Sequence, residues 1–155
     1  MADRLLSTYL NDHLAASLAA VELARRAAAS NRGTAVGERL DQLASSLEED
    51  RTALQEVMDR LGIGRDVTKL AAGWVAEKLG RLKLNGQLIG YSPLSRVEEL
   101  ELLTLGVEGK LLLWQALERI GTLEQSAELI NRARSQLQVL RRLRLEAVEL
   151  AFDRR

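Results

Sequence analysis

The side chains best able to do chemistry here are an aspartate, a lysine and a histidine that stand where helix patterns demand apolar residues. Asp50 lies in the middle of a row of apolar residues whose spacing alternates between three and four. Such spacing keeps one seam of a helix against a partner helix. An unpaired carboxylate in that seam is costly, so Asp50 needs a cation, hydrogen-bond donors or a metal. The row is Leu40, Leu43, Leu47, Asp50, Leu54, Val57 and Leu61.

Two other groups are candidate partners for Asp50, and a third residue, Tyr9, could share the partner of His13. His13 lies on the predicted apolar face of the first helix, one turn after Tyr9, and Lys110 lies within a leucine-rich helix. The sequence therefore predicts a buried polar cluster of His13, Asp50, Lys110 and Tyr9. Burial would lower the pKa of the lysine amine, whereas a lysine that reaches water on its long stem would keep its ordinary pKa. We interpret Asp50 as a member of a structural ion pair, and we identify no catalytic residue.

An alternative is a histidine-poor metal site. Glu101 and Glu108 stand seven residues apart on one helix face. Together with Asp50 and His13 they would offer oxygen and imidazole ligands to iron or manganese. In the competing interpretation that face is turned to water, and the same helix buries its more apolar stripe, of Leu100, Leu103, Val107 and Trp114. We favour burial of the apolar stripe, so no cofactor is expected.

Helical periodicity and capping signals divide the chain into five helical segments. Thr34 and the Ser92-Pro93 pair have the residue types that begin helices, and Thr122 with Gln125 has the spacing of a capping box. Four long segments are predicted at about 2–29, 34–61, 92–120 and 123–152. A shorter segment begins at Asp66, with Val67, Leu70, Ala71, Trp74 and Val75 facing inward. The predicted inner face of the first segment is Leu6, Tyr9, His13, Ala16, Ala20, Leu23 and Ala27.

Composition narrows the class of protein. The 155 residues fit one domain spanning 1–155, and the single proline and 3% aromatic content favour helix over strand. The formal net charge is zero, and no cysteine is present for disulfides or thiolate metal sites. No apolar stretch is long enough for a membrane span, and the amino-terminal residues lack the pattern of a signal peptide. We therefore expect a cytoplasmic protein.

A basic patch occurs in the last helix. Arg141, Arg142 and Arg144 are followed directly by Glu146 and Glu149, and no aromatic residue stands between the basic ones. Pairing within the helix explains this pattern better than contact with phosphates. We expect no nucleic-acid partner.

Two long helical hairpins joined by a long crossover are the connectivity of ferritin-like bundles. The chain resembles the ferritin-like superfamily in this architecture. It also looks like an uncharacterised group of high-GC actinobacterial proteins in the stretches 9–13, 86–90 and 91–94. The resemblance implies an all-α four-helix bundle, with the short extra helix in the crossover between helices 2 and 3 of the bundle.

The ferritin-like resemblance does not extend to the metal ligands. Di-iron members of the superfamily use a glutamate on two helices and Glu-x-x-His on the other two. His13 is the only histidine here, and Leu10 stands where that motif needs a glutamate. The sequence therefore predicts a metal-less ferritin-like bundle. We expect a non-catalytic protein that acts through self-association, as a homodimer, or through a protein partner.

Overall fold

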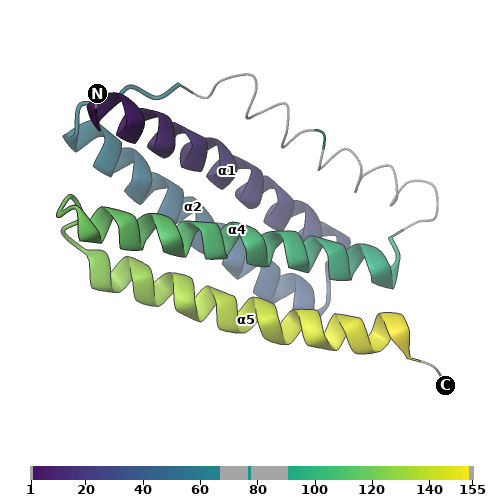
Figure 1. Ribbon diagram of the computed structural model, residues 1–155. Helices are drawn as coiled ribbons and strands as arrows, with labels where there is room; N and C mark the ends of the chain where they lie inside the picture. The colour runs from purple at the N-terminus through teal and green to yellow at the C-terminus, as the bar shows by residue number, and fades with distance from the viewer. Residues whose placement is uncertain (1, 67–76, 78–90, 154–155) are drawn as a thin grey trace.

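The computed structural model describes residues 2–66, 77 and 91–153, and within them the chain forms long α-helices and no strand (Figure 1). This confirms the prediction of an all-α four-helix protein. The predicted segment carrying Val67 to Val75 lies outside the described residues. No described helix is long and apolar enough to cross a membrane. The helices are α1 (Ala2–Ser30), α2 (Ala35–Arg60), α4 (Pro93–Arg119) and α5 (Ser126–Phe152).

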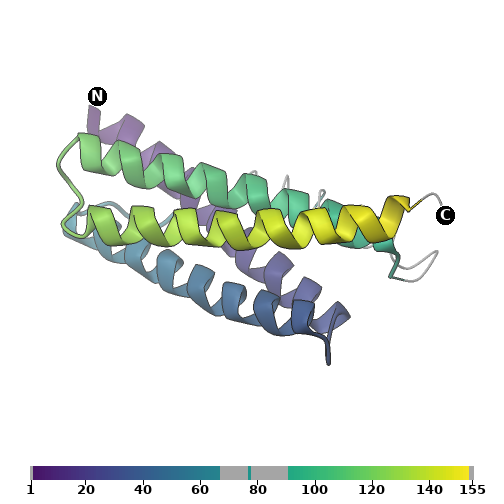
Figure 2. The same cartoon turned by 90° about the horizontal axis from the view of Figure 1, so that it is seen from below.

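The helices form two antiparallel hairpins that pack face to face. Gly33 and Gly121 close the two hairpin turns with φ of 79° and 73°, values that favour glycine. One hairpin joins α1 to α2, and the other joins α4 to α5. Between the hairpins α1 packs on α4 and α2 on α5, and the hairpins cross at an angle (Figure 2). Each helix therefore touches two neighbours and faces the fourth helix across the core.

Asn11 of α1 and Asn31, the first residue after α1, hold the ends of the segment that connects the hairpins. Asn11 donates from Nδ2 to the Gly64 carbonyl at 3.0 Å and accepts from the Asp66 amide at 2.6 Å. Twenty residues further along the chain, just past the end of α1, Asn31 Nδ2 donates to the Tyr91 hydroxyl at 2.9 Å. At the usual rise per residue these two points are about 30 Å apart. The connection between the hairpins therefore begins and ends near opposite ends of α1 (Figure 1).

The predicted caps of α2 and α4 are confirmed, whereas the predicted start of α5 is wrong. Thr34 accepts a hydrogen bond from the Gly37 amide, and Ser92 accepts one from the Ser95 amide, each at 3.1 Å. Thr122 instead donates to the Leu117 carbonyl at 3.2 Å. That carbonyl belongs to the last turn of α4 and has no partner within the helix. Thr122 thus completes α4, and α5 begins at Ser126.

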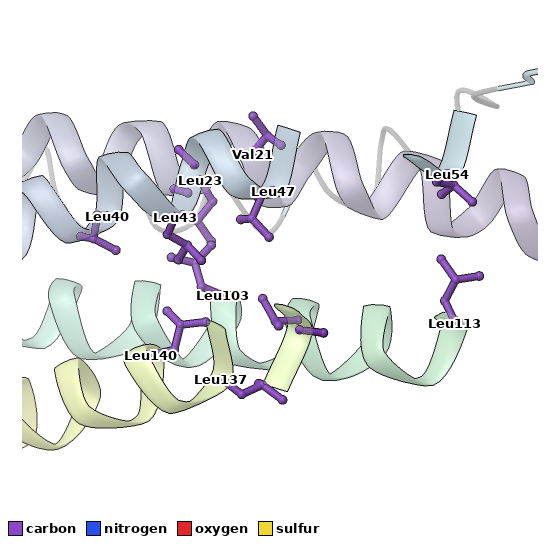
Figure 3. Close-up of a cluster of buried hydrophobic side chains, with 14 of the residues drawn as sticks. Val21, Leu23, Leu40, Leu43, Leu47, Leu54, Leu103, Leu113, Leu137 and Leu140 are labelled. Carbon is purple, nitrogen blue, oxygen red and sulfur yellow. The ribbon is translucent and has the colours of Figure 1, made fainter. Parts of the chain in front are cut away.

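Leucines from all four helices form the core (Figure 3). The α2 row is buried as predicted, except that Leu61 is exposed. On α1 the predicted face is wrong in part, because Tyr9 and Ala16 are exposed. Rotation of α1 toward its leucines buries large apolar side chains and leaves a phenol and a methyl group at the surface. The buried residues of α1 include Leu10, Leu14, Val21, Leu23, Ala24, Ala27 and Ala28.

Candidate functional site

The candidate site is centred on an ion pair between α2 and α4 near the middle of the bundle. Asp50 is 2% exposed, because its place in the α2 row faces the core. The Lys110 ammonium donates to Asp50 Oδ2 and forms a salt bridge with it. Lys110 is itself mostly buried, since it shares the α4 stripe of Leu103 and Leu113. The two residues singled out in the sequence therefore meet in the core.

A glutamine from α5 joins the two charges. Gln136 Oε1 accepts from the Lys110 ammonium, and Gln136 Nε2 donates to Asp50 Oδ2 at 2.9 Å. The same Nε2 donates to Ser46 Oγ at 2.6 Å. The amide oxygen of Gln136 therefore faces the positive charge of Lys110, and its amide nitrogen faces the negative charge of Asp50. Three helices, α2, α4 and α5, are held in one network.

Arg132 closes the network toward the surface. Its Nη1 lies 3.4 Å from Asp50 Oδ1 and 2.9 Å from Glu49 Oε2. The Nη2 atom of Arg132 lies 3.4 Å from Glu128 Oε1. We refer to Ser46, Asp50, Lys110, Arg132 and Gln136 as the Asp50 cluster.

Burial alters the chemistry of the lysine. Desolvation lowers the pKa of Lys110, while the Asp50 carboxylate acts in the opposite direction. A desolvated amine is in principle a nucleophile for carbonyl compounds. Here, however, the nitrogen already donates to Asp50 and to Gln136, which hold it as an ammonium donor. The contacts of Lys110 are those of a structural counterion.

A small cavity lies beside the ion pair. It is lined by residues of α1, α2 and α4 that include His13, Asp50, Lys110 and Trp114, and its volume is about 30 Å³. That volume accommodates roughly one or two water molecules and no substrate of ordinary size. The cavity therefore offers no room for a bound small molecule next to the amine.

His13 and Tyr9 do not bind the ion pair. His13 lines the cavity but has no hydrogen bond to Asp50 or Lys110 within the described part of the chain. Its ring meets the Tyr9 ring edge to face, with centroids 4.6 Å apart. Burial lowers the pKa of His13, with the Asp12 carboxylate opposing the effect. Of the predicted cluster, the structure joins Asp50 to Lys110 and places Tyr9 at the surface.

The two glutamates of the alternative metal set pair with arginines of α5, and neither contacts Asp50. Glu101 Oε1 lies 2.9 Å from Arg144, and Glu108 Oε1 lies 2.6 Å from Arg141. Both pairs bridge α4 and α5, so the expected pairing of these arginines within their own helix is wrong. Within residues 2–66, 77 and 91–153, no three histidine or carboxylate side chains gather as metal ligands. Helix α4 buries its apolar stripe, which consists of Leu100, Leu103, Val107 and Trp114.

A second polar cluster, not anticipated from the sequence, joins the end of α1 to the start of α4. The Tyr91 hydroxyl donates to Glu99 Oε2 at 3.1 Å and accepts from Asn31. Glu99 is buried, and this burial raises the pKa of its carboxyl group. The Arg96 guanidinium lies 5.8 Å from the Tyr91 ring centroid. This second cluster anchors the chain where it enters α4.

Comparisons with protein-family models, with curated proteins and with solved structures find no match for this chain.

Proposed function

We propose that this protein is a non-catalytic helical bundle that acts through self-association or a protein partner, with the Asp50 cluster fixing how its helices pair. The supporting observation is that the Lys110 ammonium donates to both Asp50 and Gln136, and that Gln136 in turn donates to Asp50. A buried polar group admits only the helix register in which its partners meet, while apolar contacts tolerate sliding. The cavity beside the ion pair is also too small for a substrate.

The surface supports a role in association. Leu105 and Leu112 of α4 are 68% and 62% exposed, although each is large and apolar. Single exposed leucines are common, but two on one face of a helix form a patch that is costly to leave in water. A second protein surface would bury that patch.

The ferritin-like assignment is part of this proposal. It is supported by the two antiparallel hairpins and by the ends of the connecting segment, one of which is held by Asn11 of α1 and the other by Asn31, just past the end of α1. In this interpretation the Lys110 ammonium occupies the region where ferritin-like enzymes hold metal ions between their helices. The positive charge that Asp50 needs then comes from the chain itself.

The proposal is tested by measuring the metal content of the protein. The full chain is purified without a histidine tag from cells supplemented with iron and manganese, and its metals are quantified by mass spectrometry. We expect metal far below one equivalent per chain. Near-stoichiometric metal that is lost in Asp50→Ala and retained in the exposed control Glu124→Ala would overturn the proposal.

A further inference from the structure

One row of residues on the outside of α4 repeats every seven positions. Glu98, Leu105, Leu112 and Arg119 are each separated by two helical turns, and α4 runs between α1 and α5 in Figure 1. The two leucines are the most exposed apolar side chains of α4. Residues seven positions apart lie on one face of a helix, along which a second helix can pack. We call these four residues the α4 outer row.

The charged residues of this row have no partner within the described part of the chain. Glu101 and Glu108 are the neighbouring carboxylates of α4, and both are paired with arginines of α5. Glu98 and Arg119 form no such pair with any described residue. One acid and one base are therefore left at opposite ends of a pair of exposed leucines.

The order of the row is self-complementary when two copies run antiparallel. In a two-fold arrangement centred between Leu105 and Leu112, each Leu105 lies opposite Leu112 of the second copy. Glu98 of one copy then lies opposite Arg119 of the other, and the contact occurs twice by symmetry. A parallel arrangement would instead place Glu98 beside Glu98 and Arg119 beside Arg119, which is repulsive.

The centre of the row permits close approach. Gly109 stands between the two leucines, and a Cβ added there would meet no atom within 4 Å. The space that a side chain would fill at Gly109 is therefore open within the described part of the chain. The distance between the axes of two packed helices is roughly 8 to 10 Å and depends on the side chains at the contact, so a glycine there favours the short end of that range.

We propose that two copies of this chain associate through the α4 outer row, with their α4 helices antiparallel. This inference rests on the proposed function and names its partner as a second copy. The leucine pairs supply most of the binding, and the Glu98–Arg119 pairs select the antiparallel orientation.

The first test replaces the leucines and measures association by sedimentation. Leu105→Glu with Leu112→Glu is expected to weaken dimer formation by more than about 100-fold. Leu145→Glu with Leu150→Glu on α5 is the matched control, since these leucines are also exposed, and it should leave the dissociation constant unchanged. Circular dichroism melts confirm that both variants remain folded.

The second test reports the orientation. The chain has no cysteine, so introduced cysteines are the only thiols. In an antiparallel pair, residues 105 of the two copies are about 10 Å apart along the axis, beyond the reach of a disulfide. Leu105→Cys and Leu112→Cys should therefore cross-link when mixed or combined in one chain, and neither should cross-link alone.

The charges provide a rescue experiment. Glu98→Arg places two arginines opposite each other and should weaken the dimer by roughly tenfold, as should Arg119→Glu. Combining the two substitutions restores opposite charges and should restore the dissociation constant. Failure of the double variant to recover would overturn the proposed orientation.

The outcomes separate this inference from the proposed function. A wild-type dimer that persists in the α4 double variant and is lost in the α5 control would overturn the α4 interface and leave self-association standing. Cross-linking of Leu105→Cys alone would show a parallel pair and overturn the inference. A wild-type chain that stays monomeric at high micromolar concentration would contradict self-association itself.

Discussion

Removal of the Lys110 charge should destabilise the fold far more than removal of a surface charge. Lys110→Met leaves the Asp50 carboxylate 2% exposed, with a hydrogen bond only from Gln136 and an arginine nitrogen at 3.4 Å. It also leaves Gln136 Oε1 without its donor. Breaking a buried pair from one side costs about 3 to 5 kcal/mol. That is a large share of the roughly 5 to 15 kcal/mol by which a domain is stable.

Replacing Asp50, Lys110 and Gln136 together should cost much less than removing Lys110 alone. In the triple variant Asp50→Leu, Lys110→Met, Gln136→Leu, apolar side chains of similar size fill the same space. The buried ion pair is gone, and the partly exposed Arg132 keeps its contacts with Glu49 and Glu128. Such replacements are neutral or stabilising, so we expect a free energy of unfolding within about 1 kcal/mol of wild type, or above it. Ser46 is only half-buried, so water can replace the hydrogen bond it loses.

The assay is urea unfolding followed by circular dichroism at neutral pH. Arg134→Met, an exposed charge with no ion pair in the described part of the chain, is the control and should change the free energy of unfolding by less than about 0.5 kcal/mol. The reasoning is refuted if Lys110→Met behaves like Arg134→Met. It is also refuted if the triple variant is as unstable as the single variant, because the cost would then come from packing and not from an uncompensated charge.

Three further predictions concern the rest of the bundle. Gly37→Ala should lower the free energy of unfolding, measured by urea denaturation, by about 1 to 3 kcal/mol, because the added Cβ would lie 2.2 Å from the Asn31 carbonyl oxygen. The control is Gly64→Ala, whose added Cβ would meet no atom within 4 Å. Burial raises the folded-state pKa of Glu99 above its ordinary 4.5, so the folded state binds more protons in that range. The stability of wild type relative to Glu99→Gln should therefore fall as pH rises from about 4.5 through the raised pKa, and an equal pH dependence of the two proteins would contradict this. Burial lowers the pKa of His13, the only histidine, so its imidazole signals in a nuclear magnetic resonance titration should have a midpoint below 6.5, and a midpoint above that value would be inconsistent with its position.

The ion pair could be predicted from the sequence because a helix seam has a strict period. Asp50 stands where the alternation of three and four residues requires a core position, and burial of the flanking leucines carries it inward. The partner Gln136 was missed, although it shows the same signal. It follows Ala133 by three residues and precedes Leu140 by four, and both of these are buried. A search for polar residues in every seam would have found it.

The face of α1 could not be fixed in the same way. This helix is rich in alanine, and small residues allow several rotations that bury similar apolar surface. Contacts with the other helices decide among those rotations, and they turn Tyr9 outward and Leu10 inward. The cluster of Asn31, Tyr91 and Glu99 is equally non-local, since it joins residues that are 60 positions apart in the chain. No periodic pattern within one helix predicts such a contact.

The most direct test of self-association is the mass of the purified full chain as a function of concentration, measured by sedimentation equilibrium or light scattering. The chain has a mass of 17.2 kDa. We predict that the mass rises toward twice this value between low and high micromolar concentration, and that the Leu105→Glu, Leu112→Glu variant stays at the monomer mass. A wild-type mass that remains at 17.2 kDa over the whole range would contradict the account.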